Sequence, residues 1–525
     1  MANDKVDVVI VGSGAAGSNL AARLAAGGKA VKILEAGPDR SNDHLVSSGL
    51  WARRLKWSGA PVLEEGANPV GHVFNAGQGT GGSAMHHYAV WPRFHRQDFR
   101  CRSEHDRGLD WPISYEDLAP FYDLVQTESG IAGDAEREVW RPPGEPYPLP
   151  PVPLFPQGQI LERGFDARGM KTAPLPLAVT SVAYRGRNPC LWDGWCDSGC
   201  PIGALANPVS VDLPKAFAAG AELETDATVT RVLTDVSGER ATGVEVVNSA
   251  GERREVLADM VVLAAFSIQN PRLLLASATA KHPQGLANSS GRVGQYIMTH
   301  AAGLIYGLFE ESTQSYMGAF GGQLVNQDGY AKTTHADSGA FGSYQWMIAQ
   351  AVKPNDLLGI GPTRADLFGN DLHRFMKRAA RGFATMTAVV EDLPVADNKV
   401  VLSDDQRDAN GVPLARVTHT TDPQSKSLWG ATLVEGQAIF KAAGAEEVWT
   451  GPQGAMHIMG GTIMGADPAT SVTNSYGQCH DLPNLVIAGP GLFPTSAGVN
   501  PTYTVHALAA RSAAHLLDNW GSVIV

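Results

Sequence analysis

The chain has 525 residues, more than one ordinary domain, so its length predicts two or three domains that share large hydrophobic cores. A formal net charge of −12 argues against nucleic acid as a partner, because phosphate binding requires a basic face. No run of about 18 or more apolar residues predicts a membrane span, and five cysteines are too few and too unevenly spaced for a disulfide framework. We expect no secretion signal of the chain's own, because its apolar N-terminus lacks a basic region and contains Asp7.

The first predicted element is a dinucleotide-binding motif. Four apolar residues at positions 8–11 predict a buried parallel strand. Gly12, Gly14 and Gly17 follow in the spacing G-x-G-x-x-G, which suits a tight turn, close approach to a pyrophosphate and close helix–strand packing. A helical period then leads to a second strand that ends at Glu35, whose carboxylate can accept hydrogen bonds from a ribose diol. The alternative is a glycine- and alanine-rich helix packed closely on a sheet.

A second glycine cluster follows at residues 75–88. Its glycines fit no hydrophobic period, so we predict a loop whose backbone lies against a flat or phosphorylated ligand. The alternative is a glycine-rich turn before a helix. Prolines then accumulate between residues 100 and 188, which predicts the absence of long helices and suggests a second domain or a wrapping arm. Within this region, residues 113–122 predict one short capped helix.

Three cysteines fall on one short segment. Cys190, Cys196 and Cys200 form a C-x5-C-x3-C-P arrangement that ends in Pro201. Three thiolates on such a loop predict a soft-metal site, and iron–sulfur clusters use ligands of this kind. Zinc would require a fourth ligand, and no His or Cys follows at zinc-finger spacing. The alternative is a reduced surface loop with incidental cysteines.

The next part of the chain is rich in strands. Alternating apolar residues at 229–233 and 243–247 predict a hairpin, and residues 261–265 predict a buried strand that returns to the nucleotide domain. A helix is expected to follow over 268–275. Residues 300–450 mix strands with helices such as 428–443, and we expect them to form a substrate-facing sheet and cap.

Polar chemistry returns near the C-terminus. His457 lies in a glycine-flanked stretch, and the glycines favour a functional role, although a lone histidine is more often structural. A strand predicted over 484–489 leads to Asn500 and Pro501, where a helix can begin because proline is tolerated at a first helical position. The positive end of such a helix would stabilise negative charge on a ligand.

Together these motifs resemble the glucose–methanol–choline (GMC) oxidoreductase family of flavoenzymes over nearly the whole chain. The likeness is strongest to the flavin-bearing large subunits of bacterial sugar and polyol dehydrogenases, such as those for fructose, gluconate and glucose. It rests on the cysteine run and on the stretches 285–290 and 457–468. The resemblance implies an α/β fold in which a Rossmann-like FAD-binding domain is joined to a substrate domain with a mixed or antiparallel sheet.

The resemblance also implies how the chain is divided. A discontinuous FAD-binding domain would comprise residues 1–100, 201–300 and 455–525. Residues 101–200 would form an arm that carries the cysteine loop, and residues 301–454 would form the substrate-binding domain.

By resemblance, His457 would be the catalytic base that takes the hydroxyl proton of a sugar, glycoside or polyol, and Asn500 would orient the substrate oxygen. The carbon-bound hydrogen would leave as hydride to flavin N5. His86 falls where some members attach the flavin covalently, and His87 is a weaker candidate. The residues expected to bind FAD are Gly12, Gly14, Gly17, Glu35, Gly79, Gly81, Gly82, Ser83, His86, Asn500, Pro501 and Thr502.

Cys190, Cys196 and Cys200 match the ligands of a 3Fe-4S cluster, which would pass electrons to an external acceptor. The related dehydrogenases work with a small exported subunit and a cytochrome or quinone acceptor, which implies a location at the periplasmic face of the bacterial inner membrane. Two departures stand out. Relatives often have two adjacent cysteines where this chain has only Cys190, and their Asp-His-Pro is replaced by Thr299-His300-Ala301.

Two other interpretations stay open. The chain is alternatively a cytoplasmic GMC oxidase or glycoside 3-oxidoreductase whose cysteine loop holds no metal. A hypothesis from another class is a non-catalytic flavin-binding protein on the same fold. The first motif alone would also allow an NAD-dependent enzyme, but the later motifs argue against it.

Overall fold

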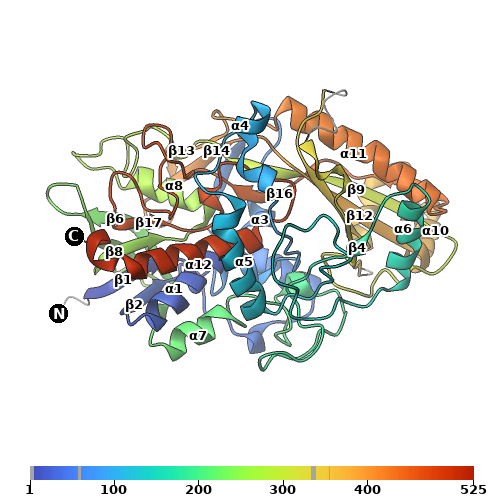
Figure 1. Cartoon of the computed structure of the whole chain (residues 1–525), viewed down its shortest axis with the longest axis horizontal. Coiled ribbons are helices and arrows are strands. Elements are labelled where there is room, and N and C mark those ends of the chain that lie inside the picture. The colour runs from blue at the N-terminus through green and yellow to red at the C-terminus, as the bar shows by residue number, and fades with distance from the viewer. Residues whose placement is uncertain (1–4, 57–58, 60, 333–338, 354, 525) are drawn as a thin grey trace.

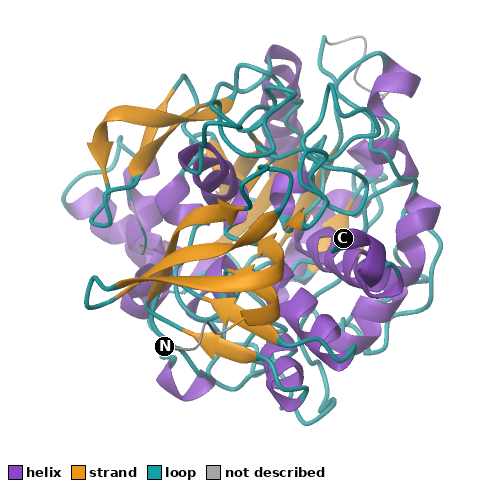
Figure 2. Cartoon of the chain, turned by 90° about the vertical axis from the view of Figure 1, so that its left-hand side faces the viewer, coloured by secondary structure: helices purple, strands orange, loops and turns teal. Residues whose placement is uncertain are grey.

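The computed structural model describes residues 5–56, 59, 61–332, 339–353 and 355–524. These residues form three β-sheets with helices around them (Figure 1). The first sheet lies on the side of the molecule that carries both termini, and the second lies beneath the long helix α11 on the opposite side (Figure 1). Figure 2 faces the termini and shows strands in the middle of the molecule with helices on both flanks. Within the described ranges, none of the helices combines the length and apolarity that crossing a bilayer requires.

The first sheet has a parallel centre. Strand β1 pairs in parallel with β2 on one side and with β8 on the other. Two strands share the edge of β8 that faces away from β1. Strand β7 pairs antiparallel with the first half of β8, and β17 pairs in parallel with its last residues. The carboxyl ends of β1, β2, β8 and β17 therefore meet at one edge, where open α/β sheets bind their ligands. The strands are β5 (Glu222–Glu224), β2 (Val31–Leu34), β1 (Lys5–Val11), β8 (Arg253–Leu263), β7 (Ala241–Asn248), β6 (Ala227–Thr234) and β17 (Leu485–Ile487).

The second sheet is antiparallel, and its two faces differ. Tyr344, Trp346 and Ile348 of β11 pack into the core beneath α11, while Gln345 and Met347 alternate toward the first sheet. A third, small sheet joins β13, β14 and β3. The strands of the second sheet are β15 (Glu447–Thr450), β9 (Met298–Leu308), β12 (Phe383–Val390), β11 (Tyr344–Ile348), β10 (Leu324–Asn326), β4 (Ala173–Pro174) and β16 (Gly454–Met459), and those of the third are β13 (Lys399–Arg407), β14 (Pro413–Thr418) and β3 (Val62–Glu65).

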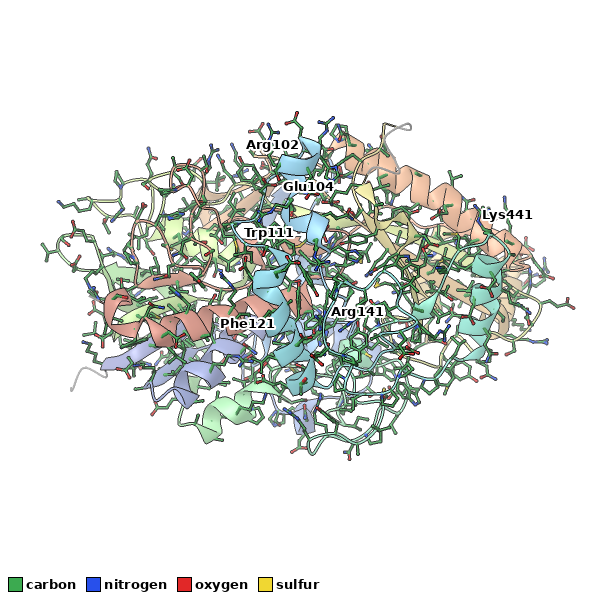
Figure 3. The ribbon with its side chains drawn as sticks, in the orientation of Figure 1. Arg102, Glu104, Trp111, Phe121, Arg141 and Lys441 are labelled. Atoms are coloured by element: carbon green, nitrogen blue, oxygen red, sulfur yellow. The ribbon has the colours of Figure 1, made fainter. Side chains whose placement is uncertain are left out.

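The helices cover the sheets and leave charged side chains outside. Arg102 and Glu104 project from α4, and Lys441 projects from the end of α11, whereas Trp111 is buried (Figure 3). The helices are α1 (Ala15–Ala26), α2 (Gly49–Lys56), α3 (His72–Asn75), α4 (Cys101–His105), α5 (Tyr115–Ser129), α6 (Pro156–Asp166), α7 (Asp212–Ala218), α8 (Phe266–Ala276), α9 (Asp356–Ile360), α10 (Asn370–Gly382), α11 (Pro423–Ala442), α12 (Thr502–Asp518) and α13 (Trp520–Val523).

Most predicted elements are confirmed. The strand over 8–11 is the end of β1, and the next strand is β2. The hairpin predicted from the alternating residues is the antiparallel pair β6–β7. The helix expected after residue 500 is α12, which begins directly after Pro501.

The prediction of no long helix between residues 100 and 188 is wrong, because α5 spans fifteen residues. Its N-terminus is capped by Ser114, whose side chain accepts a hydrogen bond from the backbone N–H of Asp117. Pro120 lies inside the helix, where its missing N–H removes only one helical hydrogen bond. The dense prolines of this region come later, from Pro142 onward.

Candidate active site

A cavity of about 810 Å³ opens at the carboxyl edge of the first sheet. Gly12 and Glu35, which directly follow β1 and β2, line one end, which we call the Glu35 end. His457 and Asn500 line the other end, which faces the second sheet and which we call the His457 end. One cavity thus connects the predicted nucleotide motif with the predicted catalytic pair.

Each of the three glycines of the first motif occupies its position for a different steric reason. A Cβ on Gly12 would lie 2.7 Å from the carbonyl oxygen of Ala264, and the φ of Gly12 is +100°. A Cβ on Gly17 would lie 2.1 Å from the carbonyl oxygen of Gly12, so glycine is required for helix and strand to approach. A Cβ on Gly14 would meet only the carbonyl oxygen of Gly81, at 3.9 Å. Gly14 lines the cavity, so its missing side chain leaves room for a ligand.

Glu35 joins the two glycine loops. Its carboxylate accepts hydrogen bonds from the backbone N–H and hydroxyl of Ser13 at 3.0 and 2.7 Å, and from the backbone N–H groups of Gly37 and Gly79, both at 3.0 Å. The backbone N–H of Gly81 in turn donates to the Ser13 hydroxyl at 3.1 Å. Glu35 lines the cavity, but protein donors already engage both of its oxygens, so its role toward a ribose stays a prediction.

The residues predicted to bind FAD divide into those that line the cavity and those that do not. Gly17, Gly79 and Gly81 do not line the cavity and act through packing or through Glu35 and Ser13. The predicted residues that do line it are Gly12, Gly14, Glu35, Gly82, Ser83, His86, Asn500, Pro501 and Thr502.

Two helices direct their N-termini at the cavity. Gly14 and Ala15 at the start of α1, and Pro501 and Thr502 at the start of α12, all line it. The first turns of these helices contain no acidic residue that would occupy their free N–H groups. The positive ends of both helix dipoles therefore favour an anionic ligand group.

The adjacent histidines His86 and His87 have different environments. The ring of His87 is held on both sides, because its Nε2 donates to the carbonyl of Ala206 at 2.8 Å and its Nδ1 accepts from the N–H of Ala89 at 3.1 Å. His86 Nε2 is buried and has no hydrogen-bond partner among the described residues. Burial, followed by the charge of Lys56, lowers the pKa of His86 to about 3, so this ring is neutral.

A β-bulge directs His457 toward the cavity. In the pairing of β16 with β9, residues 457 and 458 together oppose only Thr299. His457 accordingly has a φ of +59°, which is uncommon for a residue other than glycine, and its N–H donates to Asn75 Oδ1 at 3.2 Å. Bulges of this kind re-aim a side chain next to active sites.

His300 contacts the ring of His457. The two Nδ1 atoms lie 2.9 Å apart, and His300 Nε2 lies 3.1 and 2.9 Å from the carbonyl oxygens of Ser496 and Ala497. Because these carbonyls can only accept, His300 carries its proton on Nε2, and its Nδ1 accepts the proton of His457 Nδ1. The lone pair of His457 is therefore on Nε2.

Asn500 faces that lone pair. Its Nδ2 lies 3.1 Å from His457 Nε2, and its Oδ1 accepts from Gln345 Nε2 at 2.8 Å. Gln345 Oε1 accepts from Gln327 Nε2 at 3.0 Å, and Gln327 Oε1 accepts from His95 Nε2 at 3.1 Å. All hydrogen bonds of this chain run in one direction, which fixes the orientation of the Asn500 amide.

Burial keeps the two central histidines neutral. Burial, and then the neighbouring His300, lowers the pKa of His457 well below 6.5. Burial likewise lowers the pKa of His300, although its hydrogen bonds to Ala497 and Ser496 oppose the shift. A neutral imidazole can accept a proton at physiological pH, so the site offers a base at His457 Nε2.

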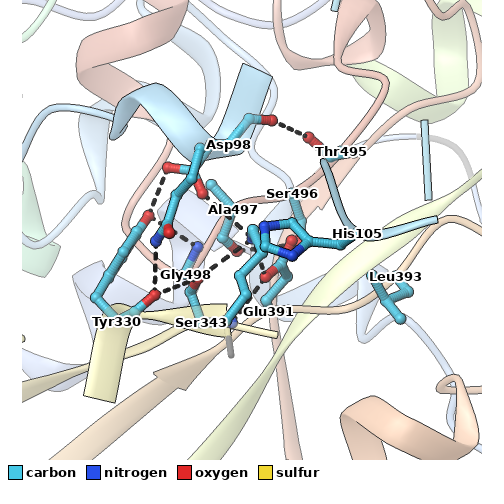
Figure 4. Close-up of polar contacts among 12 residues, drawn as sticks. Asp98, His105, Tyr330, Ser343, Glu391, Leu393, Thr495, Ser496, Ala497 and Gly498 are labelled. Carbon is cyan, nitrogen blue, oxygen red and sulfur yellow. Dashed lines mark hydrogen bonds and ion pairs between the residues drawn. The ribbon is translucent and has the colours of Figure 1, made fainter. Parts of the chain in front are cut away.

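A buried polar network holds the segment that binds His300 (Figure 4). The Tyr330 hydroxyl donates to Asp98 at 2.8 Å and accepts from the backbone N–H of Gly498 at 3.2 Å. Lys332 Nζ lies 3.4 Å from the same Asp98 and 2.5 Å from Glu391, and all three of these side chains are buried. The network therefore connects Gly498, which directly follows the Ala497 carbonyl that faces His300, with a buried cluster of paired charges.

The cysteine loop does not confirm the metal prediction. Cys190, Cys196 and Cys200 are free thiols, and burial raises the pKa of each, that of Cys190 to about 12. Across the described part of the chain, no group of three or more His, Cys, Asp or Glu side chains is arranged to hold a metal ion. The iron–sulfur cluster therefore stays a prediction.

The sequence reasoning missed His300 and Gln345 as site residues. His300 appeared only as part of a departure from related sequences, and nothing marked Gln345. The available signal was polarity, because each is a polar residue inside an otherwise buried strand. A buried polar side chain needs a partner, and here that partner is the predicted catalytic pair.

A dinucleotide-binding fold whose cavity ends at a neutral histidine and an asparagine is typical of oxidoreductases that bind a dinucleotide. The family models described as GMC oxidoreductase match residues 6–302 and 394–509, and the chain belongs to this family. It is an FAD-dependent oxidoreductase that acts on CH–OH groups. The open space at Gly14 and the two helix N-termini fit the anionic parts of FAD.

Relatives with known names support this assignment. The chain is 31% identical to 2-methyl-1,2-propanediol dehydrogenase of Mycolicibacterium austroafricanum, with 99% of this chain and 97% of the relative covered. It is 29% identical to the fructose dehydrogenase large subunit of Gluconobacter japonicus, with 98% of each covered. Its fold matches formate oxidase of Aspergillus oryzae RIB40 with a TM-score of 0.66 over 99% of both chains, at 16% identity.

Proposed function

We propose that this protein is a dehydrogenase that oxidises a hydroxyl group of a sugar, glycoside or polyol, with His457 as the catalytic base. The observation that carries the proposal is the lone pair on His457 Nε2, which faces the cavity next to the Asn500 amide. A hydroxyl group placed beside both side chains can replace the hydrogen bond from Asn500 to His457 Nε2, so that it donates its proton to His457 and receives a hydrogen bond from Asn500 Nδ2. The residues that line the cavity would hold FAD, which would supply the acceptor for the hydride of the alcohol carbon.

His300 and Gln345 determine the roles of His457 and Asn500. His300 holds the proton of His457 on Nδ1, so that Nε2 is the atom that receives the substrate proton. Gln345 engages Asn500 Oδ1, so that Asn500 presents only N–H groups to the oxygen on which negative charge develops. The base and the stabilising donor are thus both preorganised.

Replacement of His457 tests the proposal. In His457→Ala, we expect the rate of flavin reduction by every alcohol substrate to fall about 10²- to 10⁴-fold, the usual contribution of a general base. FAD content, read from the visible spectrum, should stay unchanged. A variant that retains FAD and reduces it at the wild-type rate would contradict the proposal. Wild-type protein that binds FAD but is reduced by no alcohol would support the non-catalytic alternative.

We propose that the flavin is attached covalently through His86. Support comes from the ring of His86, which lines the cavity and whose buried Nε2 has no hydrogen-bond partner among the described residues. Both ring nitrogens of His87, in contrast, are engaged. After acid precipitation, flavin should remain with the wild-type pellet and with His87→Ala, and it should be released from His86→Ala. Release from the wild-type protein would contradict the linkage.

We further propose that Cys190, Cys196 and Cys200 hold an iron–sulfur cluster, which would supply one-electron transfer to an external acceptor. Support comes from their environment, because Cys196 and Cys200 pack in the same hydrophobic cluster as Tyr88, which lines the cavity, and Cys190 is close enough to Cys200 for their charges to interact. Hydrogen bonds from the protein to cluster sulfurs are a common feature of such sites. Each of the three sulfurs accepts one from the backbone, of Trp192, Phe320 and Leu205 in turn.

Iron and acid-labile sulfide measured on anaerobically purified protein test the cluster. We expect both in the wild-type protein, loss of both in Cys196→Ser, and retention in Cys479→Ser, which changes an isolated buried thiol. Absence of iron together with rapid peroxide formation would contradict the cluster. That result would favour the alternative, an oxidase or glycoside 3-oxidoreductase without a cluster.

We propose that the chain works with a small exported subunit and a cytochrome or quinone acceptor at the periplasmic face of the inner membrane. Support comes from a relative that is itself named as the large subunit of a fructose dehydrogenase. Affinity purification from the native cell should recover a second subunit in the membrane fraction. Recovery of the active chain alone from the cytoplasm would contradict this part of the proposal.

A further inference from the structure

A buried aspartate lies next to the strand that carries His300. Asp392 is the second residue after β12, and in the antiparallel pairing of β12 with β9 Val390 opposes Ala301. This register brings Asp392 beside Thr299, whose backbone N–H donates to the Asp392 carboxylate at 3.2 Å. Thr299 directly precedes His300 on β9. Asp392 is fully buried and does not line the cavity, so its contacts are with the protein alone.

The backbone of Asp392 also contacts the loop that faces the ring of His300. Its N–H donates to the hydroxyl oxygen of Ser496 at 3.0 Å, and this hydroxyl donates to the carbonyl of Asp392 at 2.9 Å. The carbonyls of Ser496 and Ala497 are the two that accept the proton of His300 Nε2. Asp392 therefore joins the strand that carries His300 to the loop that fixes the position of its proton.

A further buried histidine contacts the same carboxylate. His419 directly follows β14, and its Nε2 lies 2.8 Å from Asp392 Oδ2, with exposed fractions of 1% for the His419 side chain and 0% for that of Asp392. Its Nδ1 lies 2.6 Å from the carbonyl oxygen of Asn68. The backbone of His419 is fixed as well, because its N–H donates to the carbonyl of Glu65 and its carbonyl accepts the N–H of Asn68. The ring of His419 is therefore held on both sides.

These contacts place a proton on each nitrogen of the His419 ring. A carbonyl oxygen can only accept, so Nδ1 carries a proton, and an ionised carboxylate can only accept, so Nε2 carries another. The backbone N–H groups of Thr299 and Asp422 donate to the Asp392 carboxylate at 3.2 and 3.4 Å. Such donors favour the ionised form of a carboxyl group over the protonated one. His419 and Asp392 thus form a buried ion pair.

The electrostatics of the three buried histidines agree with this assignment. Burial opposes the charge of His419, but the hydrogen bond to Asp392 and the charge of that residue outweigh it, so the pKa of His419 is raised above 6.5. The charge of Glu64 on β3 acts in the same direction as Asp392. For His300 and His457, in contrast, burial lowers the pKa. Near pH 6.5, His419 is therefore charged while His300 and His457 are neutral.

We propose that the Asp392–His419 ion pair positions His300, and through His300 the base His457. The proposal rests on the proposed function and adds two positioning residues to it, neither of which lines the cavity. The carboxylate of Asp392 holds the strand and the loop on either side of His300, and the His419 cation holds that carboxylate in its ionised form. A buried charge without its partner is costly, so removal of either side chain should shift the segments that contact His300.

The ring protons of the histidines test the proposal without any catalytic step. In ¹⁵N-labelled, FAD-loaded protein at about pH 6.5, NMR should show both ring nitrogens of His419 protonated and His300 protonated on Nε2 alone. The variants His419→Gln and His300→Gln assign the signals. In Asp392→Asn, His419 should become neutral, and the fraction of His300 with its proton on Nε2 should fall. A neutral His419 in the wild-type protein, or an unchanged His300 in Asp392→Asn, would overturn the proposal.

Anaerobic flavin reduction by fructose and by 2-methyl-1,2-propanediol measures the consequence for the chemical step. Asp392→Asn and His419→Gln should each slow reduction of the FAD-loaded protein about tenfold to a hundredfold, because misplacing a catalytic group by about 1 Å costs on this order. The double variant should be no slower than Asp392→Asn, since the two side chains act as a unit. Wild-type rates in both single variants would overturn the proposal. Wild-type flavin that no alcohol reduces would overturn the proposed function, and the ring protons of His300 would still decide its positioning.

Asp212→Asn is the matched control. Asp212 on α7 is likewise buried beside a histidine, with its Oδ2 3.6 Å from His506 Nδ1. It does not line the cavity, and among the described residues no hydrogen bond joins it to the segments that contact His300. Asp212→Asn should change neither the ring protons of His300 nor the rate of the FAD-loaded fraction, and an equal loss of rate would overturn the proposal. Ser496→Ala, which removes the hydroxyl bound to the Asp392 backbone, should slow reduction in the same way and serves as the second variant if Asp392→Asn does not fold.

Discussion

The Glu35 end and the His457 end of the cavity are built in opposite ways. At the Glu35 end, the cavity is lined by glycine loops, the N-terminus of α1 and the charged side chains of Glu35, Arg272, Arg407 and Asp408. The His457 end has neutral histidines, an oriented amide and the uncharged side chains of Met347 and Met456. The chain thus separates cofactor binding, which uses charge, from the chemical step, which uses a neutral base.

The two ends also differ in how the chain assembles them. At the Glu35 end, Gly12 to Gly17 are neighbours in sequence, and Glu35 reaches Ser13 across only 22 residues. At the His457 end, His300 and His457 are 157 residues apart, and Gln345 and Asn500 are 155 apart. Local sequence therefore specifies the Glu35 end. The packing of the second sheet against the first sheet specifies the His457 end.

The largest expected effect comes from a change at the Glu35 end. Gly17→Ala places a Cβ 2.1 Å from the carbonyl oxygen of Gly12, so we expect the free energy of unfolding to fall by about 3 kcal/mol. Gly14→Ala is the matched control, because its Cβ meets no protein atom closer than 3.9 Å. It should fold with wild-type stability and bind FAD more weakly. Denaturant unfolding and FAD titration would measure both, and equal destabilisation by the two variants would contradict this account.

The next effect concerns the His457 end. His300→Leu removes the acceptor that holds the proton of His457 on Nδ1, so we expect flavin reduction to slow about a hundredfold. FAD binding should be unaffected. His300→Gln can accept from His457 and donate to the Ala497 carbonyl, so it should restore part of the rate. A merely structural role would show instead as loss of FAD and stability, with a normal rate and pH profile in the fraction that retains FAD.

The smallest effect concerns the tip of the β13–β14 hairpin, where Arg272 and Asp408 line the cavity. Arg272→Ala removes an ion pair with Asp408 and hydrogen bonds to the carbonyls of Val412 and Pro413. We expect the dissociation constant of reversibly bound FAD, measured by fluorescence in a His86→Ala background, to rise about tenfold. The reduction rate at saturating FAD should not change. Arg374→Ala, on the surface of α10, is the control. A slower flavin reduction by Arg272→Ala at saturating FAD would contradict the separation of the two ends, because it would show that the Glu35 end and the His457 end are coupled.

Much of the Glu35 end could be predicted from sequence because its signals are local. The glycine spacing, the apolar strand and the position of Glu35 all lie within one strand–helix–strand unit. The same local reasoning distinguished His86 from His87 only weakly. Their difference depends on contacts with Ala206 and Ala89, which become visible only in the folded loop.

The His457 end could be predicted only in part. The motifs mark His457 and Asn500, but a hydrogen bond between distant strands leaves no periodic pattern, so the partners His300 and Gln345 were missed. The error at α5 has a related cause. Proline density was averaged over a long region, although the helix lies before most of its prolines and is specified locally by the Ser114 cap.

The pH dependence of anaerobic flavin reduction tests most directly the central claim that His457 acts as a neutral base. Burial lowers the pKa of His457 well below 6.5, so the base stays unprotonated as the pH falls through this value. We predict that kcat/KM for the alcohol is constant from about pH 8 to pH 6.5 and declines only under more acidic conditions, as His457 becomes protonated. A decline centred at pH 6.5 or above that disappears in His457→Ala would contradict the account.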